Sequence, residues 1–306
     1  PLLVVDEWGA GYENLPCPAR PFREYELEDE PLKASPATVY PQDIAYTIYT
    51  SGSTGTPKGV QIRHLSLAHY ADMMVSRYEI GPSDRAILLS SLAFDHAYAM
   101  FWPALVAGIE LTILPENAYL DAAELIRLLI DNGITILNLT PTVLNLVVHD
   151  PRFESGGRHM RLRFLFLGGE KIRMDDVRRF VRYHPHPTRF MDEYGPTEAT
   201  VGIVQRYFSL AGPEDREAWE EACQGTVIGK PIRNHKIYIL DKGMNQVGIG
   251  IPGELCISGI GLAKGYLNKP DLNREKFVTN PFEPGKKMYR TGDLARWLPD
   301  GQIEFI

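Results

Sequence analysis

The sequence predicts an α/β protein with mostly parallel sheets flanked by helices, followed by a smaller β-rich module of the distorted-barrel kind. Residues 41–222 alternate between short β-branched strands and helical stretches, which is the pattern of βα units around a parallel sheet. After residue 223, short strands separated by Gly-containing turns replace the helices. The 306 residues are 44% hydrophobic and 23% charged, a balance typical of a chain that buries a sizeable core.

The body, residues 41–222, has its elements in a regular order. We expect strands at Ile44–Thr50, Arg85–Leu89, Glu110–Leu114, Thr135–Asn138, Arg163–Leu167 and Arg189–Asp192. We expect helices at Leu65–Tyr78, Tyr98–Ala107, from a cap at Asp121 to Ile130, at Pro141–His149 and at Asp175–Tyr183. In the β-rich module, residues 223–306, we expect strands at Lys236–Leu240 and Gly253–Ser258 and a hairpin of Met288–Trp297 with Gln302–Ile306.

Residues 1–40 are rich in Pro and Glu without a sustained period, so we expect a connector from an upstream portion. The chain opens inside a strand-like run without an initiator Met and closes on the start of a strand. We therefore interpret it as part of a longer protein.

Charge and composition exclude several classes of function. The formal net charge is −7, which argues against a protein that coats nucleic acid or an anionic membrane. The three cysteines, Cys17, Cys223 and Cys256, are far apart, which fits a reducing cytoplasm better than a disulfide scaffold or a Cys-rich zinc site. No apolar run approaches the ~18 residues of a membrane span.

The strongest local signal is the Gly-, Ser- and Thr-rich run at residues 49–59, which we expect to follow a strand and precede a helix. Glycines let the backbone approach a phosphate, hydroxyls donate to it, and Lys58 adds a mobile positive charge. The pattern of a P-loop NTPase, GxxxxGK[ST], is not met, because Pro57 precedes the lysine and Gly59 follows it. Phosphate binding of another kind is the remaining interpretation.

This run resembles the phosphate-binding signature of the adenylate-forming superfamily, which includes acyl-CoA synthetases, luciferases and the adenylation domains of nonribosomal peptide synthetases. Three further segments resemble motifs of that family, in the required order: Asp192–Glu198, Gly253–Gly259 continuing through Gly261 to Leu267, and Tyr289–Leu294. Four such matches span about 250 residues. Ala45–Tyr49 and Phe94-Asp95 favour the peptide-synthetase branch.

The resemblance implies a reaction. A substrate carboxylate would attack the α-phosphorus of ATP, giving an acyl-adenylate and pyrophosphate with Mg²⁺ as the metal. The acyl group would later pass to the phosphopantetheine thiol of a carrier domain. A carboxylate is already ionised at neutral pH, so positioning and charge neutralisation, not a general base, would carry the catalysis.

The resemblance also implies residue roles. Lys58, Thr197 and Glu198 would be catalytic, with Thr197 on the α-phosphate and Glu198 holding Mg²⁺. The phosphate loop would consist of Thr50, Ser51, Gly52, Ser53, Thr54, Gly55 and Lys58. Tyr194 would stack on adenine opposite Gly168 and Gly169. Asp293 would accept from the ribose hydroxyls and Phe305 would lie against the nucleoside. Glu170, Asp192, Glu193 and Gly195 complete the expected nucleotide-binding set.

Asp192 departs from the family, which usually has Asn there. An ionised Asp accepts hydrogen bonds but cannot donate them. It could still accept from the adenine amino group.

The expected amino-acid pocket begins with Asp95, which would pair with the substrate α-ammonium; the alternative is a cap of the following helix. Alignment on the flanking motifs adds His96, Ala99, Asn138, Phe166, Gly168, Glu193, Val201 and Gly202. The small residues indicate a roomy pocket, and its polar residues favour a polar or cationic substrate side chain. In an alternative interpretation, Glu193 points to solvent.

The expected partners are the amino acid, a peptidyl carrier protein domain, and a neighbouring condensation domain or small activator protein. The resemblance places a lid with a catalytic Lys after this chain, so the chain alone should adenylate weakly or not at all. A basic stretch between Arg158 and Arg182 has two interpretations, solvated protein faces or a docking patch for an acidic carrier domain. The alternatives to amino-acid activation are an acyl- or aryl-CoA ligase of the same superfamily and a non-catalytic nucleotide-binding or docking module.

Overall fold

The computed structural model of the chain describes residues 3–5, 19–21, 38–51, 57–114, 121–209 and 226–306. The chain forms two compact units, Pro1–Tyr40 and Pro41–Ile306. In the first unit, β1 (Leu3–Val5) pairs in parallel with β2 (Ala19–Pro21). The boundary expected at residues 222 and 223 lies outside the described residues and stays a prediction.

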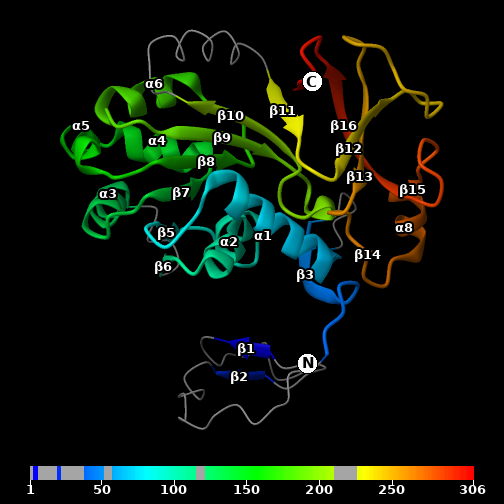
Figure 1. The fold of residues 1–306 in the computed structure, drawn as a ribbon, viewed down its shortest axis with the longest axis horizontal. Coiled ribbons are helices and arrows are strands. Elements are labelled where there is room, and N and C mark those ends of the chain that lie inside the picture. Colours follow the sequence, from blue (N-terminus) through cyan, green and yellow to red (C-terminus); the bar gives the residue numbers. More distant parts are fainter. Residues whose placement is uncertain (1–2, 6–18, 22–37, 52–56, 115–120, 210–225) are drawn as a thin grey trace. The chain divides into compact units, whose positions relative to one another are not determined.

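The second unit is built on a large sheet whose first half is parallel (Figure 1). Its parallel strands lie in the order β6 (Glu110–Ile113), β5 (Arg85–Leu88), β7 (Ile136–Leu139), β8 (Phe164–Gly168) and β9 (Arg189–Tyr194). These strands confirm the βα pattern expected from the sequence.

Side chains that alternate along these strands belong to two separate apolar layers. Leu137 and Leu165 pack on the side covered by α3 (Ala122–Asp131), α4 (Pro141–His149), α5 (Pro151–Gly156) and α6 (Met174–Tyr183). Ile136 and Phe164 pack on the other side, under α1 (His64–Tyr78) and α2 (Tyr98–Ala107). Asp121 caps α3 as expected, accepting hydrogen bonds from two backbone amides. The parallel sheet is therefore buried on both faces.

The second half of the sheet is antiparallel and continues from β9. The order is β10 (Val204–Ser209), β11 (Val227–Pro231), β17 (Ile303–Phe305), β16 (Lys287–Trp297), β13 (Gly253–Gly259) and β12 (His235–Leu240), with β15 (Phe277–Thr279) beside β16. The expected β-rich module is present. A closed barrel does not form within the described residues, because β10 and β11 join the module to the large sheet.

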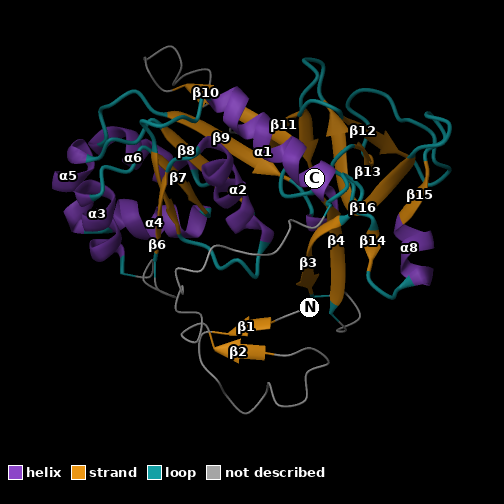
Figure 2. Cartoon of the chain, turned by 60° about the horizontal axis from the view of Figure 1, so that its bottom comes forward, coloured by secondary structure: helices purple, strands orange, loops and turns teal. Residues whose placement is uncertain are grey.

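A separate three-stranded sheet includes the strands on either side of residues 52–56 (Figure 2). It consists of β3 (Ile44–Thr50), β4 (Lys58–Arg63) and β14 (Gly265–Tyr266), the last followed by α8 (Pro270–Lys276). The helix expected after the loop is present as α1, but the strand β4, which was not predicted, comes before it. Val60 and Ile62 alternate as fully buried residues, so a strand separates the loop from α1.

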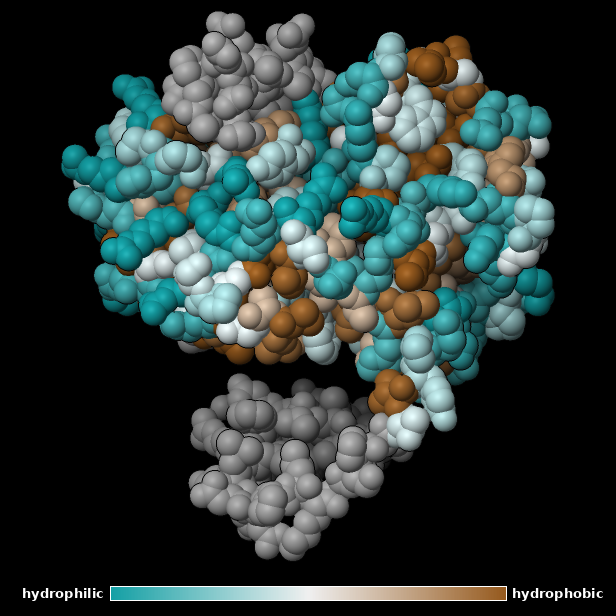
Figure 3. Space-filling model, viewed as in Figure 1, coloured by the Kyte–Doolittle hydropathy of each residue, from teal (hydrophilic) through white to brown (hydrophobic). Residues whose placement is uncertain are grey.

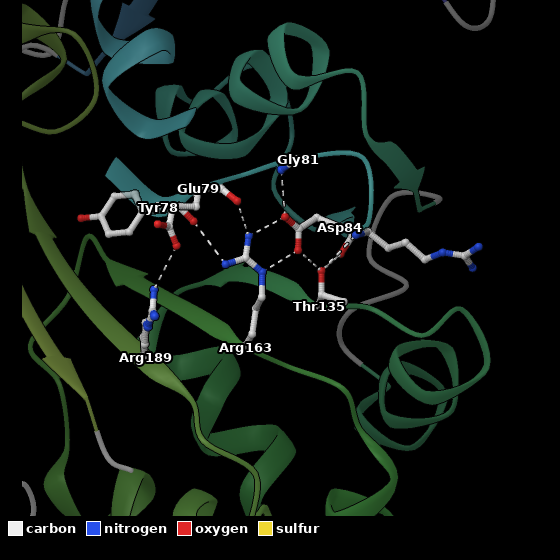
Figure 4. A network of polar contacts seen from close by, with 8 residues as sticks. Tyr78, Glu79, Gly81, Asp84, Thr135, Arg163 and Arg189 are labelled. Carbon is white, nitrogen blue, oxygen red and sulfur yellow. Dashed lines mark hydrogen bonds and ion pairs between the residues drawn. The ribbon is translucent and has the colours of Figure 1, made fainter. Parts of the chain in front are cut away.

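A polar clamp fixes the end of α1 to the sheet (Figure 4). Arg163 makes a bidentate contact with Asp84, which is 2% exposed, and donates to the carbonyls of Tyr78 and Glu79 at the end of α1. Thr135 also donates to Asp84, at 2.8 Å. Arg163 belongs to the basic stretch, as do Arg178 and Arg179, which also form ion pairs. These contacts favour the interpretation of the basic stretch as ordinary protein surface over that of a docking patch for a carrier domain.

The face of the molecule seen in Figure 3 carries hydrophobic residues in separate patches among hydrophilic ones. Within the described residues, no helix has both the length and the apolar character needed to cross a bilayer.

Candidate active site

A cavity of about 670 Å³ opens at the carboxyl ends of β7, β8 and β9, where ligands bind in open α/β sheets. It unites most of the residues expected from the sequence: Asp95, His96, Asn138, Phe166, Gly168, Gly169, Glu170, Asp192, Glu193, Tyr194, Gly195, Val201, Asp293 and Phe305. Residues expected to contact the nucleotide and residues expected to contact the amino acid therefore share one cavity.

Some expected residues lie elsewhere. Ala99 is 2% exposed and packs in the apolar layer under α1 and α2, away from the cavity lining. Gly202 lies behind Glu193, where a Cβ would come within 1.8 Å of the Glu193 carboxyl carbon. Thr50, Ser51, Lys58, Thr197 and Glu198 are not among the lining residues. Gly52, Ser53, Thr54 and Gly55 lie outside the described residues.

One part of the cavity lining consists of an aromatic pair and a carboxylate. Tyr194 donates its hydroxyl to Asp293 at 2.5 Å. Burial, and to a lesser degree the Asp293 carboxylate, raises the pKa of Tyr194 well above its usual value. The hydroxyl therefore stays protonated. The rings of Tyr194 and Phe305 lie 6.0 Å apart. A planar base and a diol would meet suitable partners here.

Two glycines, Gly168 and Gly169, form another part of the lining. Gly169 has φ +81°, a left-handed conformation that favours glycine, and a Cβ there would meet no atom within 4 Å. At Gly168, a Cβ would approach the carbonyl oxygen of Glu193 to 3.2 Å. The lining at these two positions is thus backbone, with free space in front of Gly169 only.

Asp95 begins the short 3₁₀ helix η2 (Asp95–Ala97), and its Oδ2 is buried without a hydrogen-bond partner. Burial raises the pKa of Asp95, a hydrogen bond from Thr197 lowers it, and the charge of Glu198 raises it further. The net pKa lies above the usual value. A buried carboxylate with an unpartnered oxygen in a cavity is suited to bind a cation.

His96, the next residue, has a similar unpartnered atom. Its Nδ1 lies 3.0 Å from the Ser90 hydroxyl, while its Nε2 is buried without a partner. Burial lowers the pKa of His96, so the ring is neutral at neutral pH. Asn138 donates to the backbone carbonyl of His96 at 3.0 Å, which fixes this end of the cavity.

Glu193 points into the protein, which contradicts the solvent-facing interpretation. Its carboxylate accepts hydrogen bonds from Tyr70 Oη and from Gln205 Nε2, the latter at 2.7 Å. Burial raises the pKa of Glu193 to about 7, although both hydrogen bonds act to lower it.

Asp192, where the family usually has Asn, is also perturbed. Burial raises its pKa to about 7, against the lowering effect of Arg206 on the neighbouring strand. At neutral pH a substantial fraction of Asp192 is therefore protonated, and a protonated carboxyl can donate as an amide does.

A second polar cluster surrounds Glu198, which is 5% exposed in the 3₁₀ helix η5 (Thr197–Ala199). Lys58 Nζ and Tyr266 Oη both donate to Glu198 Oε1, at 2.9 and 2.6 Å. Burial alone would raise the pKa of Glu198, but these two donors hold it below the usual value. Tyr289 Oη lies 3.3 Å from Tyr266 Oη. Thr50 contributes a buried hydroxyl without a hydrogen-bond partner.

Sequence reasoning assigned no role to three residues of this site. Tyr266 lies in a segment that matches a family motif, but the motif did not indicate what this residue does. Tyr70 lies on the buried face of α1, and Gln205 is one of two adjacent polar residues, with Arg206, between apolar ones. Only the pairing of β9 with β10 and the packing of α1 on the sheet bring both residues into contact with Glu193.

The comparison with protein families matches residues 10–267 to the model described as AMP-binding enzyme. The chain belongs to the AMP-binding enzyme family. Members of this family with similar sequences include bacitracin synthase 3 of Bacillus licheniformis, 44% identical over 85% of this chain, and surfactin synthase subunit 2 of Bacillus subtilis, 40% identical over 87%. The matches cover 4% and 7% of those relatives, so the chain corresponds to a small part of each.

Among solved structures, this AMP-binding enzyme is similar to a crystal structure of the nonribosomal peptide synthetase FmoA3. The TM-score is 0.85 at 28% identity, covering all of this chain and 32% of that one. The resemblance inferred from four motifs is thereby confirmed at the level of family and fold.

Proposed function

We propose that this AMP-binding enzyme activates an amino acid with ATP and Mg²⁺, forming an aminoacyl-adenylate and pyrophosphate, for transfer to the phosphopantetheine thiol of a carrier domain. The observation that carries the proposal is the shared cavity, whose lining includes both Asp95 and the hydrogen-bonded Tyr194–Asp293 pair. Similarity to bacitracin and surfactin synthases supports the same assignment.

In this mechanism Asp95 binds the α-ammonium and orients the carboxylate toward the phosphate side. Thr197, next to Glu198 in η5, is suited to hold the α-phosphate beside the substrate carboxylate. Lys58 neutralises phosphate charge together with the hydroxyls of the loop. Glu198 is an ionised, almost fully buried oxygen ligand, so it fits Mg²⁺, which when bound neutralises charge on the phosphates.

The substrate side chain is the finer part of the proposal. Beyond Asp95 the cavity presents Glu193, His96 and Asn138. A buried carboxylate whose pKa is raised to about 7 is stabilised by a nitrogen donor or a cation. We therefore propose a substrate whose side chain ends in an ammonium, guanidinium or carboxamide NH group. A cytoplasmic location, expected from the cysteines, stays a prediction.

ATP–pyrophosphate exchange on the full-length protein tests the function. Amino acids of the proposed class should support exchange, while fatty and aryl acids should not. Exchange with fatty or aryl acids alone would favour the CoA-ligase alternative. ATP binding without exchange for any acid would favour the non-catalytic alternative.

A further inference from the structure

We propose that Tyr70 and Gln205 are positioning residues that set the side-chain selectivity of the amino-acid pocket by fixing the carboxylate of Glu193. The inference rests on the proposed function, since selectivity has a meaning only if an amino acid occupies the cavity. Neither residue lines the cavity, so both would act through Glu193.

The two donors reach Glu193 from different elements. Tyr70, on α1, donates its hydroxyl to Oε2 at 3.0 Å. Gln205, on β10 and directly opposite Glu193 in the sheet register, donates Nε2 to Oε1 at 2.7 Å. Tyr70 is 2% exposed and Gln205 is 3% exposed, so water does not compete for these bonds. Each oxygen of the carboxylate is therefore held from the protein side.

A further hydrogen bond fixes the orientation of the Gln205 amide. Tyr78, fully buried at the end of α1, donates its hydroxyl to Gln205 Oε1 at 2.8 Å. With its oxygen engaged by Tyr78, the amide turns its NH₂ group toward Glu193. Behind Glu193, the missing side chain of Gly202 leaves just the space that the carboxylate fills. The carboxylate is thus confined on three sides, by Tyr70, Gln205 and Gly202.

The chemistry of the donors explains why this should control selectivity. A phenol and a carboxamide hydrogen-bond a carboxylate but leave its charge uncancelled. The remaining acceptor capacity of Glu193 therefore stays available to a ligand in the cavity. Without Tyr70 or Gln205, the carboxylate would lose its fixed direction, and a nitrogen donor on the substrate would lose its advantage over a hydrocarbon of equal size.

The experiment compares matched substrates in the exchange assay on the full-length protein. The pairs are lysine with norleucine, asparagine with leucine, and glutamine with methionine. For the preferred pair, Gln205→Leu and Tyr70→Phe should each lower the ratio of kcat/KM values about tenfold, mainly through the KM of the nitrogen-bearing acid. The KM of ATP should change less than about twofold. Tyr238→Phe is the matched control, because it removes a Tyr–Glu hydrogen bond in the β-rich module.

A mutant cycle separates positioning from a general structural effect. In a Glu193→Ala background, Gln205→Leu and Tyr70→Phe should cause no further loss of selectivity. An equal loss in that background, or an unchanged ratio in the single variants, would overturn the inference while leaving amino-acid activation intact. If the unmodified protein activates no amino acid, the proposed function fails and the inference fails with it. Two independent single variants keep the test decisive should one of them not fold.

Discussion

Lys58 and Glu198 lie 140 positions apart in the sequence, yet the ammonium nitrogen of one is 2.9 Å from a carboxylate oxygen of the other. In the structure, the residue expected to bind phosphates and the residue expected to bind Mg²⁺ neutralise each other. A nucleotide phosphate would have to replace Glu198 as the partner of Lys58, and Mg²⁺ would have to replace Lys58 as the partner of Glu198. Binding of the nucleotide and binding of the metal should therefore be coupled.

Replacing Lys58 by Ala should lower ATP–pyrophosphate exchange about 10²–10³-fold, because the site loses a preorganised positive charge. The KM of ATP should rise, and the KM of the amino acid should change little. The control is Lys236→Ala, which breaks an exposed pair with Glu283 in the β-rich module and should leave exchange unchanged. A Lys58→Ala enzyme with normal exchange would remove this lysine from the catalytic set.

Replacing Asp95 by Ala should abolish amino-acid activation and spare ATP binding. A buried ammonium left without its carboxylate costs about 3–5 kcal/mol, which corresponds to about a hundredfold or more in kcat/KM. Exchange kinetics and the calorimetric Kd of ATP give the two readouts. The matched control is Asp300→Asn, an exposed turn residue. Unaltered kinetics for an α-amino acid would show that Asp95 does not bind the ammonium.

Glu193 should make the stability of the ligand-free protein depend on pH. Because burial raises the folded-state pKa of Glu193 to about 7, above the ~4.3 of an unfolded chain, the fold favours the protonated form. The stabilising contribution is complete below pH ~4 and is lost as the pH rises through 7. Glu193→Gln should remove that loss, which is on the order of 3 kcal/mol. Urea unfolding of the unmodified protein and of Glu193→Gln at pH 5 and pH 8 measures this loss. If the two proteins differ in free energy of unfolding by the same amount at both pH values, the prediction is contradicted.

Asp84 should have the opposite dependence. Burial alone would raise its pKa, but the Arg163 contacts and the Gly81 and Thr135 hydrogen bonds lower it overall. Its stabilising contribution is therefore present above the unfolded value of ~3.9 and is lost as the pH falls through the folded-state pKa. At pH 7, Asp84→Asn should reduce the free energy of unfolding by about 3 kcal/mol, and at pH 3 by much less.

Asp271→Asn breaks an exposed Arg–Asp pair on α8 and serves as the control for Asp84→Asn, with an expected change below about 0.5 kcal/mol. If both variants lose the same stability at pH 7, the clamp on α1 contributes no more than a surface pair does.

The parallel half of the fold could be predicted because its signals are local. Tyr98–Ala107 and Pro141–His149 form helices with the expected bounds, and each buried strand reads as an apolar run. The strand at Val204–Ser209 was missed because Gln205 and Arg206 are polar although both are buried. Their burial depends on partners across the sheet, which no local pattern records.

The candidate site divides in the same way. Family motifs predict the identity of residues such as Tyr194 and Asp293, and both line the cavity. The roles assigned to them stay predictions. Tyr70 and Gln205 could not be found from sequence, because their contact with Glu193 depends on how α1 packs across two strands. Lys58 pairing with Glu198 through space is a relationship of the same kind.

The pairing of β3 with β4 has a consequence for changes in chain length. Thr50 and Lys58 face each other across the hairpin, so both ends of the intervening loop are pinned in register. A residue inserted between them lengthens the loop at small entropic cost and leaves the lysine where it is. A residue inserted after Lys58 within β4 would shift the strand by one pleat and turn the lysine to the opposite face. An insertion before Lys58 should therefore leave this site intact, whereas an insertion after it should disrupt the site.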